Sequence, residues 1–196
     1  MSERPAGYRP APQVVWDKEV DHLDRHCRSF IGLSPWATLA TADADGFPDV
    51  SPRGGQPGFV HVLDEHHLVL PDRPGNNRID SLRNVLVNPK VALMFVVPGI
   101  EETLRVYGTA AVRDPLDVDA DLTEFGRAPL SVLVVDVRRA FFQCAKSLMR
   151  SGLWEPETWP ERGDFASIGQ VFRDHCGLPA PLPPDEVMRA DMAQEL

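Results

Sequence analysis

Three short stretches of the chain place cationic or amide side chains among glycines and prolines. They are SPRGG with Arg53, RPGNNR over residues 73–78, and KSLMRSGLW with Lys146 and Arg150. Guanidinium groups and amides bind phosphate, and Trp154 at the end of the third stretch offers a ring for stacking. Taken singly, the stretches are also typical of a surface loop, a capped helix and a basic helix end. Taken together in an acidic protein, they favour a site for a planar anionic ligand.

The second stretch, LVLPDRPGNNRIDSL over residues 68–82, predicts an apolar strand, a turn and the start of a helix. We expect Asn76 or Asn77 to cap this helix, because an asparagine oxygen accepts a hydrogen bond from a free amide of the first turn. Asp80 would complete a capping box. Arg78 would then lie in the first turn, where the helix dipole disfavours a cation unless an anion binds there too. An ordinary connection with a solvent-exposed arginine is the alternative.

Composition sets the broad class of the protein. With 196 residues, 43% apolar and 25% charged, the chain is typical of a single soluble globular domain. Its net charge of −9 argues against nucleic acid or an anionic membrane as a partner. No apolar run is long enough to span a membrane and the N-terminus lacks a signal-peptide core, so we expect a cytoplasmic protein.

The three cysteines, Cys27, Cys144 and Cys176, are far apart and form no CxxC pair. This spacing predicts neither a disulfide framework nor a zinc site, and we expect Cys144 to be a buried structural thiol. His22 and His26 lie four residues apart without a third ligand, so we expect a solvated face and no metal site.

Short segments of strand-forming residues alternate with turns. We expect strands at 36–42, 47–51, 59–63, 68–70, 90–98, 102–113 and 130–142. Residues 51–58, SPRGGQPG, should interrupt regular structure. We expect helices at 16–30, from residue 77 to 88, at 114–126, at 165–176 and at 184–195. Strands this short favour an antiparallel barrel or sandwich over a doubly wound sheet.

The order of ATLAT, DGFPDVSPRG, LVLPDRPGNNRIDSL, NPKVALMF, ETLRVYGTA and a late KxxxRSxLW segment resembles the pyridoxamine 5'-phosphate oxidase-related, FMN-binding split-barrel family. The resemblance implies a mainly β fold with flanking helices (α+β). Its centre would be a six-stranded antiparallel split β-barrel that forms a homodimer, with FMN at the subunit interface. The chain would comprise an N-terminal arm (1–14), the FMN-binding domain (15–155) and a C-terminal helical, proline-rich extension packed on the barrel (156–196).

The resemblance also implies a set of cofactor-binding residues. In one subunit they are Arg53, Pro71, Asp72, Arg73, Asn76, Asn77, Arg78, Glu102 and Thr103, and the second subunit would add Lys146, Arg150, Ser151 and Trp154. Asn77 stands where the oxidases have a basic residue. Phosphate binding should therefore depend more on Arg53, Arg78 and backbone amides.

The implied function is that of an FMN-dependent oxidoreductase acting on a small molecule, with its catalytic residues unassigned. The oxidases end in an arginine-containing segment that holds the vitamin substrate, and PLPPDEVMRADMAQEL has no equivalent. Oxidation of pyridoxamine phosphate is therefore not expected. A non-catalytic flavin- or haem-binding or sensing module and an F420-dependent reductase are the alternatives. A hydrolase is not expected, because the sequence has no nucleophile elbow.

Overall fold

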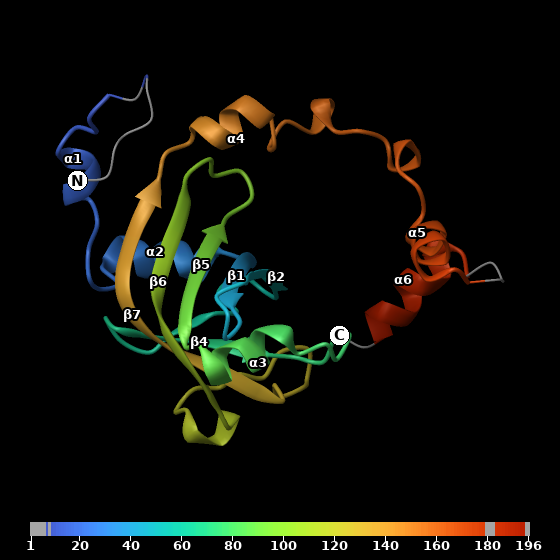
Figure 1. The fold of residues 1–196 in the computed structure, drawn as a ribbon, viewed down its shortest axis with the longest axis horizontal. Helices are drawn as coiled ribbons and strands as arrows, with labels where there is room; N and C mark the ends of the chain where they lie inside the picture. Colours follow the sequence, from blue (N-terminus) through green and yellow to red (C-terminus); the bar gives the residue numbers. More distant parts are fainter. Residues whose placement is uncertain (1–6, 8, 179–182, 195–196) are drawn as a thin grey trace. The chain divides into compact units, whose positions relative to one another are not determined.

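A computed structural model describes residues 7, 9–178 and 183–194 of the chain (Figure 1). The chain divides into two units, Met1–Ser147 and Leu148–Leu196. The first unit contains the sheet and the candidate site, and the second contains helices and turns.

The first unit is built on one antiparallel sheet. Its strands are β1 (Trp36–Ala42), β2 (Pro48–Gly54), β3 (His61–Val62), β4 (His67–Asp72), β5 (Lys90–Val96), β6 (Thr103–Arg113) and β7 (Ser131–Gln143). They lie in the order β2-β1-β5-β6-β7-β4-β3. The expected mainly β, antiparallel architecture with flanking helices is confirmed. The expected number of six strands is wrong, because the two-residue β3 adds a seventh and the sheet is open, with β2 and β3 at its edges.

Strand β2 continues further than the sequence suggested. The strand was expected to end at Ser51, yet Arg53 pairs with Ala37 and Gly54 pairs with Trp36 of β1. A proline inside a strand removes one donor from the ladder, which an edge strand tolerates because one side has no neighbour. Pro52 therefore fits in β2, and the strand ends only at Gly54.

The two longest strands, β6 and β7, bend where their register shifts. Tyr107 pairs with Arg139, but the next residue, Gly108, pairs with Val137, so that one residue of β7 is left over. A side chain at position 108 would collide with the carbonyl oxygen of Asp136. Such bulges bend a strand and increase its twist. The chain thus curves the sheet at a point where only glycine fits.

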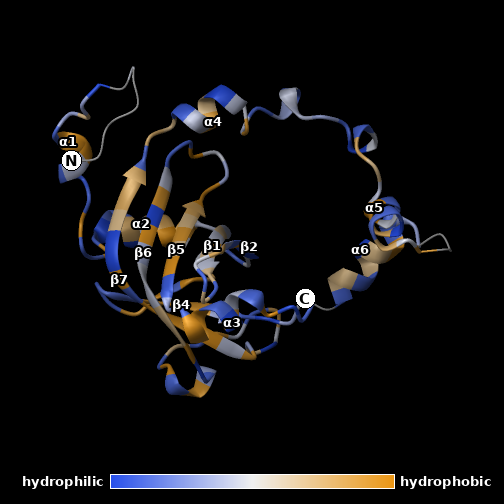
Figure 2. Ribbon diagram, viewed as in Figure 1, coloured by the Kyte–Doolittle hydropathy of each residue, from blue (hydrophilic) through white to orange (hydrophobic). Residues whose placement is uncertain are grey.

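The core lies against one face of the sheet. Fully buried side chains such as Leu39, Phe95 and Leu104 pack with Phe30 and Ile31 of helix α2 (Arg25–Leu33). Strand β5 is hydrophobic along most of its length, whereas β6 and β7 also carry hydrophilic residues (Figure 2).

The single helix expected over residues 16–30 is wrong, because α1 (Val14–Asp17) and α2 are separate helices. Between them, Val20 exchanges two backbone hydrogen bonds with Ala140 of β7. The Asp24 carboxylate then accepts hydrogen bonds from two amides of the next turn and starts α2 at Arg25.

Helix α3 (Asp80–Val87) connects β4 to β5 and ends, as expected, before Asn88 and Pro89. The surface helix expected over residues 114–126 is wrong, since only a short 3-10 turn, η1 (Pro115–Asp117), forms there. Instead, Leu122 is buried against Val69 and Val132 on the sheet. This packing fixes an irregular segment in place of a helix.

The second unit contains two of the expected helices, α5 (Ile168–Cys176) and α6 (Asp185–Gln194). The Ser167 hydroxyl caps α5, and Gly177 ends it in a left-handed conformation. Two 3-10 turns, η2 (Pro156–Thr158) and η3 (Arg162–Asp164), precede them, and α4 (Lys146–Ser151) follows β7. Packing of this extension on the sheet stays a prediction. Among the described residues, none of the helices has the length and apolar character needed to cross a membrane.

Candidate functional site

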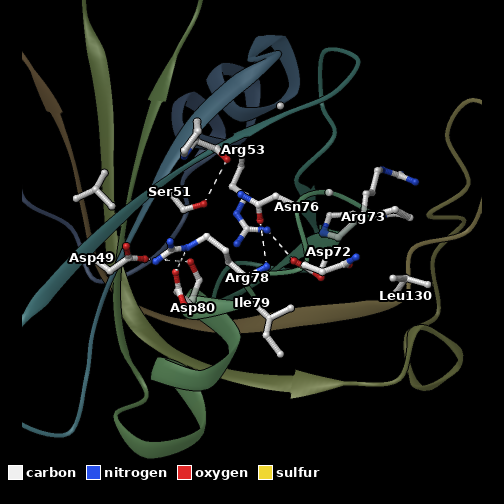
Figure 3. A pocket seen from close by; sticks show the side chains of 18 of the residues that line it. Asp49, Ser51, Arg53, Asp72, Arg73, Asn76, Arg78, Ile79, Asp80 and Leu130 are labelled. Carbon is white, nitrogen blue, oxygen red and sulfur yellow. Dashed lines mark hydrogen bonds and ion pairs between the residues drawn. The ribbon is translucent and has the colours of Figure 1, made fainter. Parts of the chain in front are cut away.

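A pocket of about 490 Å³ lies between β2, the end of β4 and the turn that leads into α3 (Figure 3). Seven of the sequence-predicted binding residues line it: Arg53, Pro71, Asp72, Arg73, Asn76, Asn77 and Arg78. They come from two stretches that are separate in the sequence. The structure thus brings together the first two of the three stretches that suggested an anion site.

Further lining residues were missed by sequence reasoning. Asp49 and Ser51 lie along β2 beside Arg53, and their side chains share one face of the strand (Figure 3). The alternation of polar residues at positions 49, 51 and 53 was the signal that could have found them, because side chains two residues apart in a strand point the same way. Leu130, just before β7, also lines the pocket, and nothing in the sequence indicated it.

Arg53 is the most enclosed cation of the pocket. Its Nη1 donates to Asp72 Oδ1 at 2.7 Å, and the two side chains are only 18% and 15% exposed. Its Nε is buried and donates to no acceptor among the described residues. A buried donor without a partner is costly, so an acceptor that reached this atom would stabilise it.

Arg73 is held on the far side of the turn by the segment before β7. Its Nη1 and Nη2 donate to the carbonyl oxygens of Arg127 and Leu122, and its Nε lies 3.1 Å from Glu124 Oε2. All three nitrogens therefore have protein partners. These contacts give the Arg73 side chain a structural role, and its expected role in binding a cofactor stays a prediction.

Arg78 is the exposed cation of the pocket. Its side chain is 75% exposed, and its Nε lies 2.7 Å from Asp80 Oδ2. The hydrogen bond to Asp80 raises the pKa of the Arg78 guanidinium. Exposed ion pairs are weak, so an anion in the pocket can compete with Asp80 for this guanidinium.

The start of α3 differs from the expected capping arrangement. The helix begins at Asp80, and its N-cap is Ile79, which has φ 51° and makes no side-chain cap. Asn76 Oδ1 accepts instead from the Arg78 amide at 3.1 Å, and Asn77 is also left-handed. This local turn uses the asparagines before the helix starts, so Arg78 precedes the helix and is not in its first turn.

A carboxylate already lies beside the first turn of α3. Asp49 Oδ2 accepts from the Ser81 hydroxyl at 3.3 Å. The pocket lining contains equal numbers of arginines (Arg53, Arg73 and Arg78) and aspartates (Asp49, Asp72 and Asp80), so their charges balance. A bound anion would therefore have to exchange partners with these aspartates, as the Arg78 pair allows.

The remaining predicted residues do not line this pocket. Glu102 is exposed just before β6, and Thr103 is buried at the start of that strand. Lys146, Arg150 and Ser151 belong to α4, and Trp154 follows it. Their contribution from a second subunit stays a prediction.

The cysteines differ in environment. Cys27 is buried, and burial raises the pKa of its thiol to about 12. Cys144 is exposed, so the expectation of a buried thiol is wrong. A hydrogen bond to the Lys146 backbone amide lowers the pKa of the Cys144 thiol. The part of the chain that the structure describes holds no group of three His, Cys, Asp or Glu side chains placed to bind a metal ion.

Comparison with known proteins gives a family and distant relatives. A family model described as pyridoxamine 5'-phosphate oxidase matches residues 23–144, more than half of the chain. A curated pyridoxine/pyridoxamine 5'-phosphate oxidase from Anaeromyxobacter dehalogenans is 29% identical over 153 residues, which cover 78% of this chain. The match spans only 62% of the length of that relative.

Two solved structures are similar to part of this chain. The H111A variant of HupZ from Group A Streptococcus is 19% identical, with a TM-score of 0.47, and the match covers 62% of this chain and 99% of that one. The haem storage protein HutZ from Vibrio cholerae is also 19% identical, with a TM-score of 0.41 and coverage of 61% and 93%.

Proposed function

This chain belongs to the pyridoxamine 5'-phosphate oxidase family, and from that premise we propose that it is an FMN-binding flavoprotein. The cofactor's phosphate would bind in the pocket between β2 and the β4–α3 turn. The observation that carries the proposal is Arg53, which lines this pocket and whose buried Nε has no partner among the described residues. Arg78 and the amides of Asn76 and Asn77 would supply further donors.

The residues present fit a phosphate-bearing ligand. A volume of about 490 Å³ lies within the range of roughly 300 to 1,000 Å³ that is typical of small-molecule sites. Asp72 keeps the Arg53 guanidinium oriented through its contact at 2.7 Å and leaves Nε as the free donor. Arg78 would exchange its exposed contact with Asp80 for the phosphate.

FMN, when bound, supplies hydride transfer to or from a small substrate. This chain would bind the phosphate through Arg53 and Arg78, and the backbone of Pro71 and Asp72 would contact the cofactor. No pocket side chain is assigned a proton-transfer role. We therefore propose an oxidoreductase whose substrate is a small molecule, with the chemistry carried by the flavin.

The lining of the pocket favours a flavin over haem. Protein ligands of haem iron are His, Cys, Met or Tyr side chains, and the residues that line the pocket in the described part of the chain include none of these. The deazaflavin F420 also carries a phosphate that the two arginines could hold. Identification of the cofactor released from purified protein distinguishes FMN from F420.

We further propose that two copies of the chain enclose the cofactor. Val50, Ile79 and Leu130 line the pocket and are exposed. Apolar side chains grouped at the rim of a polar site are typical of a covered surface. Sedimentation velocity should find a homodimer, and a monomer at the concentrations that bind FMN would contradict this.

The test of the proposal is a titration of the cofactor-free protein with FMN, followed by quenching of flavin fluorescence. FMN should bind much more tightly than riboflavin, which lacks the phosphate. Equal affinities for FMN and riboflavin would show that the pocket does not bind the phosphate. If neither compound binds, the proposal is refuted. Reduction of the bound flavin by NADH or NADPH in stopped flow then separates an enzyme from a carrier.

A further inference from the structure

The irregular segment between β6 and β7 carries Glu124, whose carboxylate contacts both the chain after β2 and the chain after β4. We propose that Glu124 is a positioning residue that holds the end of β2 and the β4–α3 turn in register. The part of this inference that concerns the ligand rests on the proposed function. Glu124 itself does not line the pocket, so it would act only through its partners.

The carboxylate contacts a different segment with each oxygen. Its Oε1 accepts from the backbone amide of Gln56, two residues beyond the end of β2. Its Oε2 lies 3.1 Å from Arg73 Nε, one residue beyond the end of β4, in an ion pair without hydrogen-bond geometry. The Glu124 side chain is only 10% exposed. Removing one partner from such an enclosed contact leaves the other unpaired, which is costly.

The segment that carries Glu124 is fixed by its own packing. Leu122 is buried against Val69 and Val132. Glu124 and Arg127 exchange two backbone hydrogen bonds at 3.1 and 3.0 Å, which close a tight turn. Glu124 is thus a rigid support and not the tip of a loose loop.

The fit around the carboxylate is close. A Cβ at Gly55 would lie 2.7 Å from the Cβ of Phe59 and 2.8 Å from both oxygens of Glu124, so the chain beside the pocket accepts only glycine there. Gly55 separates Gln56 from Gly54, which lines the pocket. A shift of the carboxylate would therefore move the end of β2.

This contact matters because β2 and β4 do not pair with one another. Four strands separate them in the sheet, so side-chain contacts must set the distance between them at the pocket. The Arg53–Asp72 pair is one such contact. Glu124 adds a second, and it also pairs with Arg73, so that a ligand would be met by Arg53 and Arg78, each of which has one aspartate partner.

The experiment compares the full-length protein with its Glu124→Gln variant. Gln keeps the shape and one oxygen that can accept from the Gln56 amide, but it loses the charge that pairs with Arg73. Amide hydrogen exchange should quicken in residues 54–58 and 72–79, and not in β5 or β6. The dissociation constant for FMN should rise about tenfold, a change of about 1.4 kcal/mol. Glu65→Gln, which removes an exposed partner of Arg28 outside the pocket, is the matched control and should change neither.

Arg73→Gln tests whether Glu124 acts through Arg73. It should reproduce both effects, and the double variant should be no worse than the more affected single variant. Unchanged exchange near the pocket, exchange that quickens uniformly, or local loosening with an unchanged affinity for FMN would each overturn the inference. If the unaltered protein binds no FMN, the proposed function fails, and the exchange data alone decide whether Glu124 holds the two segments.

Discussion

Arg53 Nη1 lies 2.7 Å from Asp72 Oδ1 and joins β2 to β4, although β1, β5, β6 and β7 lie between them in the sheet. The contact is possible because the sheet curls until its β2 edge approaches β4. The pocket lies at this closure, so one ion pair both completes the curved sheet and orients the guanidinium that we assign to the phosphate.

The Asp72→Asn variant should therefore be less stable. It leaves Arg53 largely enclosed and without its charged partner, and we expect a loss of about 1 to 3 kcal/mol in the free energy of unfolding. Urea unfolding measures this. The matched control is Asp136→Asn, whose exposed contact with Arg138 should contribute little. If both variants lose the same free energy of unfolding, the Arg53–Asp72 contact stabilises the fold no more than an exposed ion pair does.

The Arg78→Ala variant should bind FMN about ten- to a hundredfold more weakly, because it loses a charge-assisted hydrogen bond to the phosphate. Affinity for riboflavin should hardly change. Arg83→Ala, an exposed arginine one turn into α3 that does not line the pocket, is the control. An unaltered dissociation constant for FMN would exclude Arg78 from the site.

The Asp80→Asn variant should bind FMN more tightly, by about two- to fivefold, because Asp80 competes with the phosphate for Arg78. The same change should slightly destabilise α3, since a negative charge in the first turn is favourable there. Fluorescence titration and urea unfolding measure the two effects. Weaker binding would mean that Asp80 orients Arg78 and does not compete for it.

The buried thiol of Cys27 should make the protein less stable in alkali. In the folded chain the pKa of Cys27 is about 12, against an ordinary value of 9.0. The unfolded chain therefore loses this proton first, and the free energy of unfolding falls as pH rises from 9.0 towards about 12. Urea unfolding at several pH values should give a steeper fall for the unaltered protein than for Cys27→Ala. If the free energy of unfolding falls equally with pH in the unaltered protein and in Cys27→Ala, the raised pKa of Cys27 is refuted.

Cys144 should react with iodoacetamide before Cys27. It is exposed, and the hydrogen bond to the Lys146 amide lowers the pKa of its thiol, so more of it is thiolate near neutral pH. Mass spectrometry of the peptides after brief alkylation gives the order, and Cys144→Ser identifies the fast site. Equal labelling of Cys27 would contradict its burial.

Sequence reasoning found the strands with strong local patterns, such as KVALMFVVP, which became β5, and the strand ending in VLVVDVRRAFF, which became β7. It ended β2 too early, because Pro52 signals a break unless the strand is known to be an edge. It also placed the caps of α3 on asparagines that the preceding turn uses. Local propensity shows neither that β2 is an edge strand nor that the turn before α3 uses the two asparagines.

The site was predicted in composition but not in arrangement. Arg53 and Arg78 were expected to bind a phosphate, and the structure places both at one pocket. Arg73 was expected to join them, but its partners lie in the 122–127 segment, about fifty residues away. Glu124 could not be found from the sequence, because its importance comes from two long-range contacts that no local pattern reveals.

The shape of the pocket should also depend on the bend at Gly108, a residue that does not line the pocket. At this bulge β6 and β7 approach too closely for a side chain, and such a bulge increases the twist of the sheet. A variant with alanine at position 108 would keep every proposed binding residue, and we expect it to bind FMN more weakly. Searches for inactive relatives should therefore inspect this glycine as well as the arginines.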